Sequence, residues 1–125
     1  MESKIPGSRR ILSFKYAISG IFTALKEEPN LKFHFLAAVL VVTAGVLLNI
    51  SKADWIVILF LIGFVISVEL TNTAIEAVVD AFTDQEHPRA KLAKDISAGA
   101  VLIAAITSVI VGILIFLPYL SQWAI

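Results

Sequence analysis

The chain has 125 residues, of which 58% are hydrophobic, and a soluble domain of this size could not bury so much apolar surface. Ten basic and ten acidic residues cancel, so the charge gives no support for a nucleic-acid partner. The absence of cysteine excludes a disulfide framework, a thiol nucleophile and a thiolate metal site. Composition therefore predicts a small, all-α integral membrane protein with a single domain over residues 1–125.

The first predicted element is an amphipathic helix at about residues 8–28. Basic residues lie among the positions between its apolar residues, which share one helix face. Those apolar residues are Ile11, Phe14, Ile18, Ile21, Phe22 and Leu25. Pro29 disfavours helical geometry at Glu28 and marks a break there. A basic amphipathic helix of this kind is typical of a membrane surface.

Three apolar segments follow, at about residues 31–49, 55–82 and 96–120, and each is long enough to cross about 30 Å of hydrocarbon. Basic residues near the ends of spans set their orientation. The N-terminal segment and the second connector are rich in lysine and arginine, whereas the turn between the first two spans has only Lys52. We therefore expect a multi-pass protein of the cell (inner, cytoplasmic) membrane, with a cytoplasmic N-terminus and an external C-terminus.

The second span carries acidic residues in its latter half. At 100° per residue, five polar positions fall within an arc of roughly 100° on one helix face: Glu69, Asn72, Thr73, Glu76 and Asp80. Glu69 lies about 10 Å deeper in the membrane than Glu76 at a rise of 1.5 Å per residue. An isolated carboxylate in hydrocarbon costs several kcal/mol, and such residues are functional by default. Asp80, near the span end, is more simply interpreted as a snorkelling or capping group.

The predicted topology brings Glu28, Glu69, Glu76, Lys94 and Asp95 to one membrane leaflet. Two carboxylates, Glu28 and Glu76, make a hard-oxygen site of the kind Mg²⁺ uses together with water and phosphate. Lys94 offers a point charge for phosphate, and the deeper Glu69 could act as general base toward an alcohol in the lipid layer. The set predicts phosphoryl transfer from a nucleotide to a membrane hydroxyl.

Two further observations bear on this hypothesis. The chain has no Gly-rich phosphate loop, so any nucleotide site has to be built by the ends of the spans. The alternative is a non-enzymatic, proton-conducting membrane subunit in which Glu69 and Glu76 carry or sense protons. That alternative leaves Glu28 and the Lys94–Asp95 pair without a role.

Three segments, "ALKEEPN" (24–30), "ELTNTAIEAVVD" (69–80) and "HPRAKLAKDISAGAV" (87–101), resemble the prokaryotic diacylglycerol kinase family. The resemblance covers nearly the whole chain in the same order. It implies a homotrimer with active sites between subunits near the cytoplasmic face, ATP as phosphoryl donor, and Mg²⁺. It also implies that Glu69 is the proton acceptor, that Asn72 positions it, and that Glu28 and Glu76 are metal carboxylates that also face ATP.

The resemblance assigns further residues to the nucleotide. Lys94 and Asp95 match a nucleotide-contacting pair. Gln85, Glu86 and His87 match a loop on the phosphate side. Arg9 and Tyr16 lie where the surface helix of the family touches nucleotide.

The family has two branches, which phosphorylate either diacylglycerol, giving phosphatidic acid, or the polyprenyl alcohol undecaprenol, giving undecaprenyl phosphate. The segments "KEEPNLKFHF" and "IVGILIFLP" resemble the undecaprenol branch, and Lys32 and His34 depart most clearly from the other. The resemblance therefore implies undecaprenol as acceptor, with diacylglycerol as the alternative.

Overall fold

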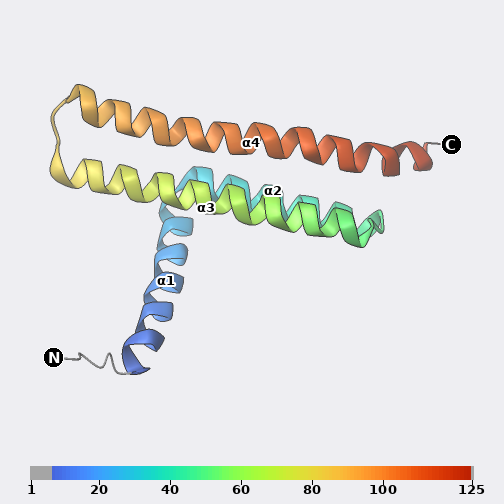
Figure 1. Cartoon of the computed structure of the whole chain (residues 1–125), viewed down its shortest axis with the longest axis horizontal. Coiled ribbons are helices and arrows are strands. Elements are labelled where there is room, and N and C mark those ends of the chain that lie inside the picture. Colours follow the sequence, from blue (N-terminus) through green and yellow to red (C-terminus); the bar gives the residue numbers. More distant parts are fainter. Residues whose placement is uncertain (1–6, 125) are drawn as a thin grey trace.

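The structure, a computed structural model, describes residues 7–124. This range folds into α1 (Gly7–Glu27), α2 (Pro29–Leu47), α3 (Lys52–Phe82) and α4 (Pro88–Trp123) and contains no strand. Helices α2, α3 and α4 run alongside one another, whereas α1 leads away from them at a steep angle (Figure 1). The prediction of an all-α protein is confirmed for the described residues.

Local sequence explains where the helices begin. Glu28 has extended backbone angles, and Pro29 opens α2 at the first position, where a missing N–H costs nothing. Asn49 takes a left-handed φ of 50° in the turn after α2, and the Ser51 hydroxyl then accepts a hydrogen bond from the Asp54 N–H to cap α3. The result is a tight α2–α3 hairpin.

Helix α4 begins at Pro88, well before the predicted start of the third span near residue 96. His87 is its N-cap, because the ring Nδ1 accepts a hydrogen bond of 3.2 Å from the Arg89 N–H. Proline at the first helical position reinforces this start. The connector is therefore partly helical, and Lys94 and Asp95 lie on α4 rather than in a loop.

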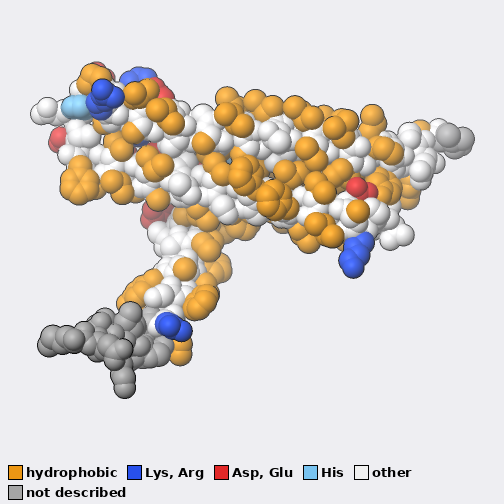
Figure 2. Space-filling model, viewed as in Figure 1, with side chains coloured by type: hydrophobic (Ala, Val, Ile, Leu, Met, Phe, Trp, Pro, Cys, Tyr) orange, Lys and Arg blue, Asp and Glu red, His pale blue; other side chains and the backbone are white. Residues whose placement is uncertain are grey.

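Three of the helices, α2, α3 and α4, are long and apolar enough to cross a membrane. Their surfaces are covered largely by hydrophobic side chains, while charged groups gather toward the ends of the bundle (Figure 2). On α1 the apolar side chains are also exposed, with Phe14 at 74%. The bilayer would cover such surfaces, and the location of α1 on the membrane surface stays a prediction.

Helix α3 is the centre of the bundle and packs against both α4 and α2, whereas α2 and α4 do not approach each other closely within the described range. At one end of the bundle the Tyr119 hydroxyl donates to Asp54 Oδ2 at 2.5 Å and accepts from the Ser51 N–H at 3.0 Å. This contact ties the end of α4 to the start of α3. The opposite end of α3 carries the acidic residues.

Candidate active site

Glu69 lies at the centre of the polar end of the bundle and is only 2% exposed. It continues the face of α3 that buries Val65 one turn earlier, so the helix itself directs the carboxylate inward. Its Oε2 atom is buried and has no hydrogen-bond partner. The Nε2 atom of His34, from the facing helix α2, lies 3.9 Å away. A buried polar atom without a partner is uncommon in proteins and marks this carboxylate for a functional explanation.

Glu28 and Glu76 both lie close enough to act electrostatically on Glu69. Glu28 comes from the junction between α1 and α2, and Glu76 lies two turns beyond Glu69 on α3. Both side chains are partly buried. Two segments, α3 and the α1–α2 junction, therefore contribute the acidic groups around Glu69.

The donor chemistry of Glu28 and Glu76 fits magnesium. Mg²⁺ is commonly held by one or two carboxylates, with water and substrate phosphates completing its shell. The described residues contain no cluster of three or more histidine, aspartate or glutamate side chains that would enclose a metal without a substrate. A magnesium ion shared with a nucleotide is compatible with both facts.

Lys94 joins this cluster from α4. Its Nζ atom forms an ion pair of 2.8 Å with Asp80 Oδ1 across the α3–α4 contact, and Glu76 also acts on it electrostatically. Asp80 is therefore the ion-pair partner of Lys94 and not an isolated capping group. Asp95, next in sequence, points instead along its own helix to Lys91 Nζ at 2.6 Å.

Asn72 is buried, and its recorded hydrogen-bond partner is Ser97 on α4 rather than Glu69. The Ser97 hydroxyl lies 2.7 Å from Asn72 Oδ1 and 3.0 Å from the Lys94 carbonyl oxygen, and it donates to one of them at a time. Sequence reasoning missed Ser97. The available signal was its position three residues after Lys94, which places the two residues on one helix face.

The other predicted nucleotide contacts are less closely gathered. Gln85, Glu86 and His87 are exposed in the α3–α4 connector. Tyr16 is 70% exposed and belongs to α1, the helix that leads away from the bundle (Figure 1). The Arg9 side chain lies outside the described residues. Within one chain, the structure shows no contact between Glu69 and the side chains of Tyr16, Gln85, Glu86 or His87, and the roles of these residues and of Arg9 stay predictions.

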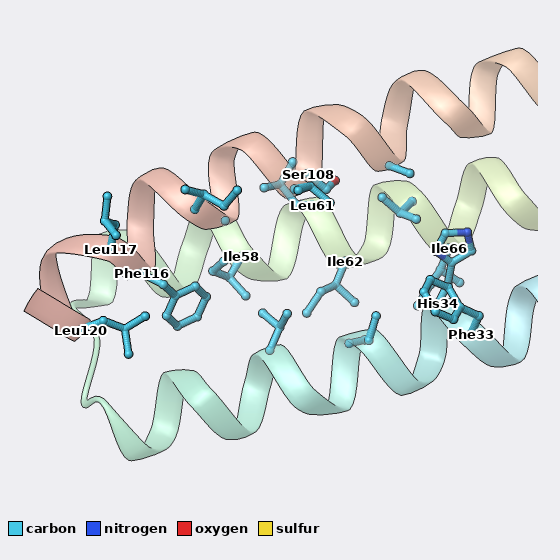
Figure 3. A pocket seen from close by; sticks show the side chains of 18 residues that line it. Phe33, His34, Ile58, Leu61, Ile62, Ile66, Ser108, Phe116, Leu117 and Leu120 are labelled. Atoms are coloured by element: carbon cyan, nitrogen blue, oxygen red, sulfur yellow. The ribbon is translucent and has the colours of Figure 1, made fainter.

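An apolar groove of about 490 Å³ opens between α2 and α4, with α3 as its floor. Phe116 and Leu120 of α4 lie at one end, and Phe33, His34 and Ile66 lie at the other (Figure 3). Ile66 is three residues before Glu69, so this second end reaches the acidic cluster. The groove has the shape and polarity to hold a hydrocarbon chain whose polar end lies beside Glu69.

The prokaryotic diacylglycerol kinase family profile matches residues 15–116. This chain belongs to the prokaryotic diacylglycerol kinase family. The matched range contains every predicted site residue except Arg9.

Several members of this family are similar over most of the chain. Undecaprenol kinase of Bacillus subtilis is 48% identical over 90% of this chain and 92% of its own length. Diacylglycerol kinase of Synechocystis is 42% identical over 86% of this chain and 62% of its own. Diacylglycerol kinase of Escherichia coli K12 is 32% identical over 88% and 91%. Both branches of the family are therefore represented among its relatives.

Proposed function

We propose that this protein is a membrane lipid kinase that transfers the γ-phosphate of ATP to undecaprenol, giving undecaprenyl phosphate. The observation that carries the proposal is the buried Glu69, which lies near Glu28 and Glu76 and faces His34 at one end of an apolar groove. A long lipid alcohol has matching parts, an apolar chain and one hydroxyl. Family membership supports ATP as the donor.

Glu69 and Lys94 each have a role in the proposed reaction. Glu69 takes the proton from the lipid hydroxyl as its oxygen attacks the γ-phosphorus, a new P–O bond forms, and the bond to the bridging oxygen of ADP breaks. Lys94 balances charge on the phosphates, and its ion pair with Asp80 holds the ammonium group at the α3–α4 contact. We assign Glu69 as the general base because its carboxylate is buried and faces His34, which lines the end of the groove.

Glu28 and Glu76 would hold Mg²⁺ together with the nucleotide phosphates. When bound, the ion neutralises the charge of the transferring phosphoryl group. In its absence the two carboxylates would repel the nucleotide phosphates, because both groups carry negative charge. We therefore expect transfer to require the ion.

The choice of undecaprenol rests on the similarity to the Bacillus subtilis enzyme at 48% identity, with diacylglycerol as the alternative acceptor named by the other relatives. We further propose a homotrimer in the cell membrane with a cytoplasmic N-terminus. An active site between subunits would let Tyr16 of one chain reach a nucleotide near Glu69 of another, which α1 does not achieve within a single chain.

The first prediction concerns Glu69→Gln. Purified protein in mixed micelles should transfer radiolabelled phosphate from ATP to undecaprenol faster than to diacylglycerol, and chelating Mg²⁺ should stop it. Glu69→Gln keeps the shape of the side chain but cannot accept the proton, so kcat should fall by about 100-fold or more. Glu27→Gln is the matched control, because Glu27 is exposed at the end of α1 and should keep the wild-type rate.

Two outcomes would contradict the proposal. The assignment of Glu69 is wrong if its glutamine variant retains wild-type turnover in folded protein. Absence of transfer to any lipid alcohol, combined with ATP-independent proton flux through liposomes, would favour a proton-conducting subunit. A faster rate on diacylglycerol would keep the kinase and change its acceptor.

A further inference from the structure

His34 is the side chain of α2 that lies opposite Glu69. Its Nε2 atom is 3.9 Å from Glu69 Oε2, and its side chain is 15% exposed. The same residue lines the end of the apolar groove that lies beside Glu69 (Figure 3). His34 therefore touches the lipid-accessible space and faces the proposed general base at the same time.

Glu69 Oε2 needs a hydrogen-bond donor, and the described residues around it offer few. Glu28 and Glu76 are carboxylates, which only accept when ionised. Asn72 is engaged with Ser97, and Lys94 is paired with Asp80. The imidazole N–H of His34 is the donor that faces this oxygen.

We propose that His34 is a positioning residue, whose Nε2–H holds Oε2 of Glu69 and thereby presents the other carboxylate oxygen to the alcohol that leaves the groove. This inference rests on the proposed lipid-kinase function. It gives a role to the histidine of the segment "KEEPNLKFHF". The atoms transferred in the reaction do not change, because the alcohol proton still goes to Glu69.

The distance is consistent with such a role. A direct N–H···O bond needs about 2.7–3.2 Å, so the two side chains have to approach by about 1 Å. Catalytic hydrogen bonds are often long before substrate binds and shorten in the reacting complex. Entry of a lipid hydroxyl beside His34 would exclude water from the pair and strengthen their contact.

The second prediction compares His34→Gln with His34→Met. The two side chains have similar length, but only glutamine places an N–H group near the position of Nε2. We expect His34→Met to lower kcat by about 100-fold through a misplaced carboxylate, with the KM for ATP within about 2-fold of wild type. His34→Gln should recover most of this loss. Thr43→Val, a polar-to-apolar change on an exposed position of α2, should leave kcat unchanged.

The outcomes separate this inference from the function on which it rests. If both His34 variants keep wild-type kcat, or both lose the same activity, His34 does not act as a donor, and the inference is overturned whatever Glu69→Gln does. A large difference between the glutamine and methionine variants, at equal thermal stability, supports it. If the wild-type protein transfers no phosphate to any lipid alcohol, the proposed function itself fails and takes the inference with it.

Discussion

Single polar side chains between α3 and α4 hold these two helices together at the candidate site. Asn72 and Ser97 are both buried and join the two helices through one hydrogen bond of 2.7 Å. In an apolar bundle such a bond stabilises by roughly 1 kcal/mol, because the separated groups also find partners. Its larger effect is on the alignment of α4 along α3, because Ser97 lies on the turn of α4 from which Lys94 reaches Asp80.

The third prediction is therefore that Ser97→Ala lowers the free energy of unfolding in detergent by about 1 kcal/mol and also reduces kcat. Asn72 would lose its partner, and Lys94 would be less firmly placed. Ser121→Ala provides the control on the same helix, because the Ser121 hydroxyl bonds only locally, to the Pro118 carbonyl oxygen. Equal melting temperatures and turnover for both variants, measured by circular dichroism and phosphate transfer, would contradict this role.

The sequence indicated Glu69 as a functional residue, because placing a carboxylate deep in an apolar helix costs free energy. It did not reveal that His34 faces Glu69, or that Ser97 meets Asn72. A histidine near a span end and a serine within a span are both tolerated in many settings. Their importance depends on which helix lies opposite, and that depends on packing between α2, α3 and α4, which no periodicity within one segment encodes.

At the level of helices, single residues that act locally set where each helix begins and ends. Such residues can be recognised in the sequence. Pro29 separates α1 from α2, as expected from the sequence. The early start of α4 could not be deduced from hydropathy, because four of the eight residues 88–95 are charged and a hydropathy count follows the apolar segment rather than the backbone. The combination of His87 and Pro88 as cap and first residue was the missed signal.

The α2–α3 hairpin depends on a small residue, Gly45, near its turn. A Cβ atom added at Gly45 would lie 2.8 Å from Cη2 of the Trp55 ring, which is closer than real side chains allow. Trp55 packs across this position next to the turn. Gly45 is therefore required by packing, independently of its backbone freedom.

The fourth prediction follows from this contact. Gly45→Ala should destabilise the protein by about 1–3 kcal/mol through overpacking and shift the Trp55 fluorescence. Gly63→Ala is the control, because a Cβ there meets nothing within 4 Å. The two variants can be compared by their melting temperatures in one detergent. A Gly45→Ala protein as stable as the control would mean that the ring moves aside freely.

The whole molecule is divided into two polar ends and an apolar middle. One end holds the acidic cluster with Lys94, and the other holds the Ser51–Asp54–Tyr119 contact. The groove between α2 and α4 lies between these ends and extends from Leu120 to His34 along part of the bundle. The proposed nucleotide site lies at the end with Glu28, Glu76 and Lys94, so the orientation of the bundle decides whether that site faces ATP.

The fifth prediction tests that orientation. The chain has no cysteine, so single cysteines introduced at Ala53, Asp84 and Gln122 can be labelled without background. Lysine and arginine near α1 and the α3–α4 connector should retain both in the cytoplasm, where ATP is available. An impermeant maleimide added to intact cells should therefore label Ala53→Cys and Gln122→Cys, and should reach Asp84→Cys only after lysis. Labelling of Asp84→Cys in intact cells would place the carboxylates on the side without ATP, and a kinase that uses the cytoplasmic nucleotide would then be untenable.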